Sequence, residues 1–295
     1  MSRPLSTQRV GLAKRINLIF DEPRRAQNLT SCYGTLNSNY SLLRFLACYV
    51  TFNSIFAAGV AALTSAVHIR GDLFGEKART NRLIRDRSAE IASHIFHAAE
   101  DEYDVIGASK NVSHRTLAQR CLERSSSSLG IALSAFNDIS RDAELRDFLN
   151  EVKSNYGIGA SLDDTMMFRG LGFHLASEQC ARQEFILFDG FLQTHYPQLV
   201  DDLTGILEPW GINGYHWIKV HCSVEEDHWR EALQAIELAL KYYVGRKSPQ
   251  IVLREIEKGF ALFTQLQERF FRYATDRKYS HTTEKKRLSR RTQHE

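Results

Sequence analysis

The chain has 295 residues, of which 43% are hydrophobic, and it carries a formal net charge of +3. This length and composition indicate one large domain with tails and enough apolar side chains for a buried core. The five cysteines lack CxxC spacing, which argues against a disulfide framework or a zinc ribbon and predicts reduced cysteines in a cytoplasmic protein.

Residues 1–40 are expected to form an N-terminal extension without a clear signal peptide. Lys14 and Arg15 are followed by only a short apolar run, residues 16–20, and then by charges. Residues 45–67 contain no charged side chain and are long enough to span a bilayer. Because polar residues interrupt this stretch, we predict a buried helix and no membrane span.

Most of the remaining chain has the apolar periodicity of helices, with apolar residues recurring at intervals of three and four. The expected helices are residues 41–67, 79–102, 113–126, 143–155, 168–194, 197–207, 215–244 and 251–273. Strand signals are scarce, so we predict an all-α bundle over residues 41–275. Residues 276–295 hold seven Lys or Arg against three acids, which predicts a solvated, disordered tail and no nucleic-acid partner.

The segment from Val220 to Trp229 spaces a histidine, a glutamate and a histidine at positions i, i+4 and i+7. On a helix, His221, Glu225 and His228 therefore share one face. Two neutral imidazoles and a carboxylate suit a divalent transition metal such as iron, and they leave coordination positions open for oxygen or substrate. The motif predicts a catalytic metal site, provided that other segments supply further ligands.

Residues 97–115 offer a second acid and histidine. Glu102 lies at the end of one predicted helix, and His114 lies near the start of the next. His94 and His97 are interpreted as ordinary histidines of a helix face. The acids that compete with Glu102 for the ligand role are Glu100, Asp101 and Asp104.

The predicted helix over residues 168–194 offers a third acid. Glu178 shares a helix stripe with His174, while Glu184 points elsewhere, and either acid could reach a central metal. The alternative for Glu178 is a simple ion pair with Arg182, four residues further along the helix.

In this chain order, the residues resemble the heme-oxygenase-like diiron oxidase and oxygenase superfamily. That superfamily includes the chlamydial protein that associates with death domains and its cyanobacterial relatives. The resemblance covers residues 41–273, and His221, Glu225 and His228 match the last family motif position for position. The family usually has Asp where this chain has Glu225, whose side chain reaches one methylene further.

The two earlier family motifs are matched more loosely. Residues 89–102 are similar to the family helix that ends in an acid, and His114 is similar to the histidine that follows it. The gap between them is somewhat long, so Asp104 stays an alternative. Ala176-Ser177-Glu178 is similar to the central acidic motif. The long stretch after this motif leaves Glu184 or Asp189 as alternatives.

The resemblance implies a heme-oxygenase-like bundle of about seven or eight helices that binds two Fe(II) ions and uses O2 as co-substrate. The implied metal ligands are Glu102, His114, Glu178, His221, Glu225 and His228. Three carboxylates would offset most of the charge of two Fe(II) ions. The implied chemistry is abstraction of a hydrogen atom or an electron from a bound small organic substrate.

An oxidising site of this kind needs a dry pocket, and the uncharged residues 45–67 are a candidate wall. Tyr49 or Tyr103 is expected to lie close enough to the metal to be oxidised. The candidate aromatic lining residues are Tyr49, Phe52, Phe56, Phe168, Phe173, Phe185 and Trp217. A homodimer is compatible with a helical bundle of this size.

Two other functions fit the same sequence. A metal-free protein of the same fold would use the acids and histidines as general acid–base groups or hydrogen-bond anchors. An interaction protein would use the bundle surface and the basic tail to bind a partner. Binding of iron separates both alternatives from the oxidase.

Overall fold

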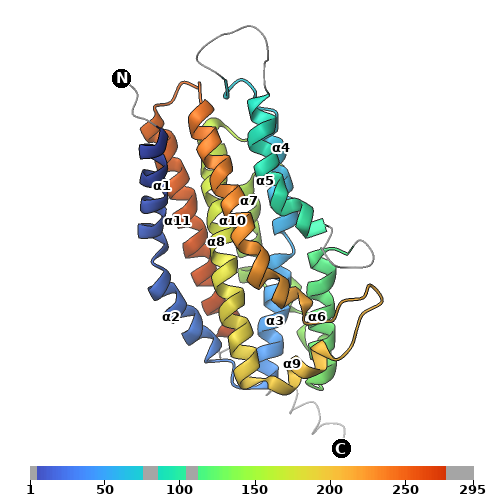
Figure 1. The fold of residues 1–295 in the computed structure, drawn as a ribbon. Coiled ribbons are helices and arrows are strands. Elements are labelled where there is room, and N and C mark those ends of the chain that lie inside the picture. Colours follow the sequence, from blue (N-terminus) through green and yellow to red (C-terminus); the bar gives the residue numbers. More distant parts are fainter. Residues whose placement is uncertain (1–4, 76–85, 104–111, 277–295) are drawn as a thin grey trace, which may run out of the picture.

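The computed structural model describes residues 5–75, 86–103 and 112–276 (Figure 1). Within these ranges the chain forms eleven α-helices and two short 3-10 turns and no β-strand, so the predicted all-α class is confirmed. The helices are α1 (Leu5–Phe20), α2 (Glu22–Tyr33), α3 (Asn39–Asn53), α4 (Phe56–His68), α5 (Arg87–Tyr103), α6 (His114–Ser128), α7 (Ala143–Tyr156), α8 (Asp164–His195), α9 (Pro197–Thr204), α10 (His216–Tyr242) and α11 (Pro249–Thr275).

The predicted single helix over residues 41–67 is wrong in one respect, because it is divided into α3 and α4. At the division, the side chains of Asn53 and Ser54 donate hydrogen bonds to the carbonyl oxygens of Tyr49 and Thr51. Polar side chains that bond to nearby carbonyls in this way compete with the helical ladder of backbone hydrogen bonds. The apolar run is therefore two helices joined by a short turn.

The same apolar run has the length and composition of a membrane-spanning helix. Over Asn39–His68, the most apolar window has a mean hydropathy of 1.7, and half of that window is buried inside the bundle. Leu42, Leu43 and Phe45 are fully buried, as are Cys48 and Tyr49. Burial of this kind is consistent with a core helix of a soluble protein.

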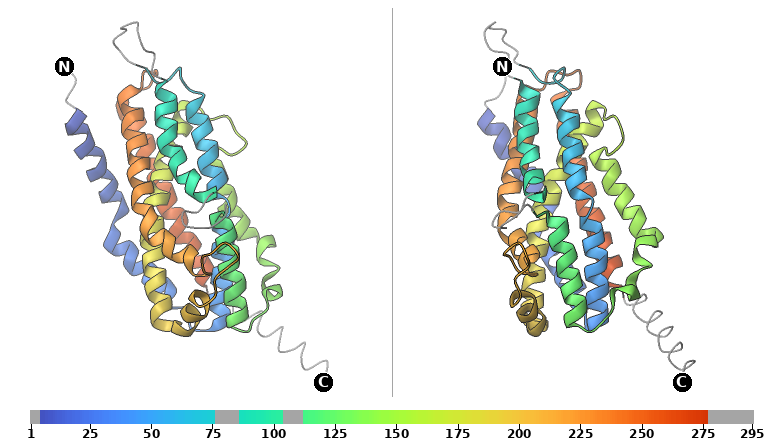
Figure 2. Two further views of the ribbon diagram at one scale, coloured as in Figure 1. Left: turned by 45° about the vertical axis from the view of Figure 1, so that its right-hand side comes forward. Right: turned by 90° about the vertical axis from the view of Figure 1, so that its right-hand side faces the viewer.

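Helix α8 forms the centre of the bundle, with α10 and α11 packed against it (Figures 1 and 2). Its contact with α11 is unusually close because both helices have a glycine at the crossing. A Cβ atom on Gly172 would collide with the carbonyl oxygen of Ile256, and one on Gly259 would collide with that of Arg169. The glycines let the two backbones approach each other directly.

Residues within the predicted N-terminal extension form α1 and α2, which lie along the outer side of the bundle (Figures 1 and 2). Helix α1 packs against α11, and α2 packs against α8 and α11. Arg25 of α2 is only 3% exposed and donates a hydrogen bond to the carbonyl oxygen of Thr264. Of the expected basic tail, residues 276–295, all but Asp276 lie outside the described residues.

Replacing Gly259 by Ala is expected to lower the free energy of unfolding by about 2 kcal/mol, because the new methyl group would force two packed helices apart. Chemical denaturation measures this change. Gly190→Ala is the matched control, since Gly190 lies in α8 with no atom within 4 Å of the added Cβ. That substitution should leave stability unchanged or raise it by less than about 1 kcal/mol. Equal stability of the two variants would contradict the close crossing.

Candidate metal centre

Helix α10 carries two histidines and a glutamate on its buried side, where it packs against α8 and α5. His221, Glu225 and His228 are 6%, 3% and 3% exposed. Oε1 of Glu225 lies 3.8 Å from Nε2 of His221, and Oε2 lies 3.5 Å from Nδ1 of His228. Glu225 therefore stands between the two imidazoles and presents one oxygen to each.

The first group of possible metal ligands joins the end of α5, the start of α6 and α10. Ligand-type atoms of Glu102, His114 and His221 all lie within 4.8 Å of one another. Nδ1 of His114 is 3.6 Å from Oε1 of Glu102, and the ring centroids of His114 and His221 are 4.5 Å apart. Ser113 caps α6 by accepting a hydrogen bond from the backbone N–H of Thr116, which fixes His114 as the first residue of the helix.

The second group joins α8 and α10. Ligand-type atoms of Glu178, Glu225 and His228 also lie within 4.8 Å of one another, and all three residues are buried. Oε2 of Glu178 is 3.5 Å from Nδ1 of His228. Since Glu225 also faces His221 of the first group, the two groups adjoin. The structure thus brings together all six predicted ligands.

In two imidazoles, a hydrogen bond on one side of the ring determines which nitrogen faces the candidate ligand groups. Nδ1–H of His221 donates to the carbonyl oxygen of Trp217 at 2.6 Å, which leaves Nε2 facing the first group. Nε2 of His228 lies 2.8 Å from Oδ2 of Asp101, which leaves Nδ1 facing the second group. A carbonyl or carboxylate partner of this kind fixes the tautomer and the orientation of a metal-binding histidine.

Two buried atoms of these groups, Nδ1 of His114 and Oε2 of Glu225, have no hydrogen-bond partner among the described residues. Buried polar atoms are rarely left in this state. A cation bound in each group would satisfy these atoms. A set of three carboxylates and three imidazoles is also the donor chemistry that first-row divalent metals such as iron accept. The residues therefore fit a pair of metal ions.

When no cation is bound, protons on the ligand residues offset part of the negative charge of the three carboxylates. Burial would lower the pKa of His228, but hydrogen bonds with Asp101 and Glu178 outweigh it and raise the pKa well above its usual value. Burial raises the pKa of Glu225 to about 8 and lowers the pKa of His221 far below its usual value. A metal must displace protons from His228 and Glu225, so its affinity should increase with pH.

The alternative roles considered for residues of α8 are not those in the structure. Glu178 lies 3.1 Å from Nδ1 of His174, whereas Arg182 is half exposed and pairs with Glu226. The alternative prediction of an ion pair between Glu178 and Arg182 is therefore wrong. Asp189 bonds to the Tyr215 hydroxyl and the Lys219 ammonium group.

Glu184, the other rival acid of α8, is 5% exposed and accepts a hydrogen bond from the Tyr49 hydroxyl. Neither Glu184 nor Asp189 is part of the two ligand groups. The helix periodicity separates them, since Glu178 points toward α10 and Glu184 toward α3 and α11.

Other acids and histidines near the end of α5 also lie outside the ligand groups. His94 is 2.5 Å from Oε2 of Glu231 at the side of the bundle. His97 is 44% exposed and lies 3.9 Å from Glu100. Asp104 falls outside the described residues.

The two predicted oxidisable tyrosines have different surroundings. Tyr103, the last residue of α5, is 54% exposed. Tyr49 is fully buried, and its ring centroid is 5.5 Å from that of Phe185 and 5.5 Å from that of Trp217. Phe185 in turn stacks on the imidazole of His221, with centroids 4.2 Å apart. Tyr49 is thus one aromatic residue away from a candidate ligand.

The other aromatic residues proposed as pocket lining lie in several places. Phe56 and Phe173 both pack against Tyr156. Phe52 stacks on Phe270, and Phe168 packs against Phe74 and Tyr243. These last contacts belong to the ordinary core.

The sequence did not mark Tyr156, and it offered Asp101 only as a rival ligand to Glu102, whereas Asp101 bonds to His228. The Tyr156 hydroxyl is 2.9 Å from the Ser177 hydroxyl and 3.4 Å from Nδ1 of His174. Ser177 is next to Glu178 and lies 3.3 Å from one of its oxygens. No local pattern marks Tyr156, because it reaches the site from the end of α7.

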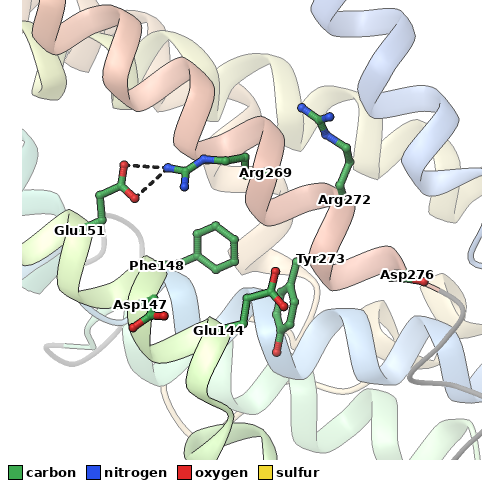
Figure 3. A pocket seen from close by; sticks show the side chains of 8 residues that line it. All are labelled: Glu144, Asp147, Phe148, Glu151, Arg269, Arg272, Tyr273 and Asp276. Atoms are coloured by element: carbon green, nitrogen blue, oxygen red, sulfur yellow. Dashed lines mark hydrogen bonds and ion pairs between the residues drawn. The ribbon is translucent and has the colours of Figure 1, made fainter.

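A separate groove of about 630 Å³ lies between α7 and the end of α11 (Figure 3). Its lining includes Glu151 and Arg269, which form an ion pair at 2.7 Å, and it contains none of the six candidate ligands. The paired charges make it an ordinary polar surface.

No protein-family model matches this chain, and no curated protein sequence matches it. A solved structure is similar: the crystal structure of a CADD-like protein of unknown function from Nostoc punctiforme PCC 73102. The TM-score is 0.59 at 12% sequence identity, and the match covers 91% of this chain and 97% of that one. The two proteins share their all-helical fold.

Replacing Asp101 by Asn is expected to weaken Fe(II) binding by about 10- to 100-fold, because the carboxylate that orients His228 becomes a neutral amide. Anaerobic titration of the metal-free protein with Fe(II) measures the affinity. Glu100→Gln is the matched control, since Glu100 lies on the same helix, is 64% exposed and should leave the affinity unchanged. Equal affinities for the Asp101 variant and the native protein would refute this role.

Proposed function

We propose that this protein is an O2-dependent non-heme iron oxidase or oxygenase that holds two iron ions and acts on a small organic substrate. The observation that carries the proposal is the convergence of the six candidate ligand residues from α5, α6, α8 and α10 into two adjoining groups, in which all residues but the partly exposed Glu102 are buried. The CADD-like fold supports it, because that fold is compatible with a diiron protein.

The charge of the ligand set is suited to two divalent ions. Glu102, Glu178 and Glu225 supply three negative charges against four positive charges. Three carboxylates this close together in a buried site would repel one another without cations. Bound Fe(II) ions would supply the electrons that reduce dioxygen, and the three imidazoles leave room for open coordination positions.

The surrounding residues hold the ligands and keep water away from them. Trp217 and Asp101 fix two imidazole rings through hydrogen bonds. Phe185 covers one face of His221. A rigid and apolar surrounding of this kind strengthens electrostatic interactions within the site and limits side reactions with water.

The aromatic surroundings support the proposed class of substrate. Aromatic rings near His221 favour an organic molecule with an apolar body. We place the protein in the cytoplasm as a possible homodimer without a nucleic-acid partner, and all five cysteines are free.

Iron stoichiometry tests the proposal. The native protein should bind two Fe(II) per chain under anaerobic conditions, and admission of oxygen should change its optical spectrum. His221→Ala combined with His228→Ala should abolish binding of both ions, because each group loses an imidazole. Metal analysis after gel filtration measures the stoichiometry.

Single substitutions resolve the two groups. Glu225→Ala should weaken the binding of both ions, since Glu225 faces both groups. Glu102→Ala should abolish the binding of one ion only. His97→Ala, at a 44% exposed histidine outside both groups, is the control and should bind two ions. Absence of iron binding above background in the native protein would leave the metal-free or the interaction function.

A further inference from the structure

A second polar cluster is buried in the core beside the candidate metal centre. The Tyr49 hydroxyl of α3 donates a hydrogen bond to Oε1 of Glu184 in α8, with the two oxygens 2.5 Å apart. Tyr49 is 0% exposed and Glu184 is 5% exposed. Neither residue is part of the ligand groups, so the metal site does not explain this pair.

The orientation of Glu184 is fixed by a chain of donors. Arg25 of α2 donates to Oε1 of Gln267 in α11, so the amide nitrogen of Gln267 faces Glu184. That nitrogen donates to Oε2 of Glu184. Oε2 is therefore engaged, and Oε1 is the oxygen that shares a proton with Tyr49.

Aromatic rings connect the pair with the candidate metal centre. The rings of Phe185 and Trp217 lie between Tyr49 and His221, with Phe185 stacked on the imidazole. Trp217 also accepts the hydrogen bond from His221 through its carbonyl oxygen. An electron that leaves Tyr49 toward His221 thus crosses one layer of aromatic side chains.

We propose that Glu184 is the proton acceptor for one-electron oxidation of Tyr49, so that the two residues form a proton-coupled redox pair. In this step the O–H bond of the phenol breaks, and the proton forms an O–H bond with Oε1 of Glu184. One electron leaves Tyr49 for the oxidant. The products are a neutral tyrosyl radical and a neutral carboxylic acid.

The charge balance of the core favours this step. Before oxidation the pair carries the single negative charge of the Glu184 carboxylate, and after it the pair is neutral. Without an acceptor, oxidation would leave a positive charge on a fully buried phenol, which is costly in an apolar interior. Burial raises the pKa of Glu184 to about 8, so its carboxylate is a stronger base than most.

The groups around Glu184 set the pH at which it can act. From α2, the Arg25 guanidinium lowers the pKa of Glu184, but the effect of burial is larger. Burial keeps the phenol of Tyr33 and the thiol of Cys180 neutral by raising the pKa of each. Above pH 8 the Glu184 carboxylate is ionised and can accept the proton, whereas below that pH it already holds one.

This role within oxygen chemistry rests on the proposed function, with iron-reduced dioxygen as the oxidant. The pair itself can be tested without metal. Ultraviolet irradiation of frozen metal-free protein, with hexaamminecobalt(III) as electron acceptor, generates tyrosyl radicals that electron paramagnetic resonance detects. The Tyr49 signal is the difference between the native protein and the Tyr49→Phe variant.

At pH 9 the Tyr49 signal should fall at least about tenfold in Glu184→Gln, because the amide cannot accept the proton. Tyr33→Phe is the matched control. Tyr33 is 1% exposed, and its hydroxyl donates to the backbone carbonyl of Glu184, which is not a base. That variant should keep the full Tyr49 signal.

The native protein alone provides a second readout if Glu184→Gln does not fold. Its Tyr49 signal should decrease between pH 9 and pH 6.5 as Glu184 becomes protonated. A Tyr49 signal that is independent of pH, or that persists in a folded Glu184→Gln variant, would overturn the proposal.

An iron-loaded sample separates this inference from the proposed function. After loading with Fe(II) and exposure to oxygen, the same Tyr49 signal should appear in the native protein and be absent from Tyr49→Phe. If the protein binds no iron, the proposed function fails, while the metal-free experiment still decides the role of Glu184.

Discussion

The placement of Glu225 between two imidazoles is the constraint on which the rest of the site depends. A glutamate that is 3% exposed needs partners for both oxygens, and its oxygens face His221 on one side and His228 on the other. One face of α10 therefore contributes residues to both candidate ligand groups. Glu102 of α5 and His114 of α6 complete the first candidate group, and Glu178 of α8 completes the second.

The fold provides the rigidity that such a site requires. The close contact between α8 and α11 at Gly172 and Gly259 fixes the position of α8 relative to α11. Glu178 is six residues beyond Gly172 on α8. On another face of α8, Glu184 bonds to Tyr49 and Gln267. One central helix therefore contributes Glu178 to the candidate metal centre and Glu184 to the proposed proton-transfer pair.

The two buried carboxylates show how surroundings divide chemically identical groups. His174 and His228 outweigh the effect of burial and lower the pKa of Glu178, whereas burial dominates at Glu184 and raises its pKa to about 8. Glu178 is thus an anion that attracts cations. We assign Glu184 to proton transfer and not to metal binding because its two oxygens bond to Tyr49 and Gln267, outside the two candidate ligand groups.

The sequence by itself determined the all-α class, most helices of the bundle and the face shared by His221, Glu225 and His228, because apolar periodicity and spacing along one helix are local properties. It did not predict α1 and α2 or the division between α3 and α4. It also suggested the other ligands, although Glu184 remained a rival of Glu178. Only the tertiary structure decided between them, since the partner of each acid lies on another helix. Tyr156 was missed for the same reason: its neighbours in space are 18 or more residues away along the chain.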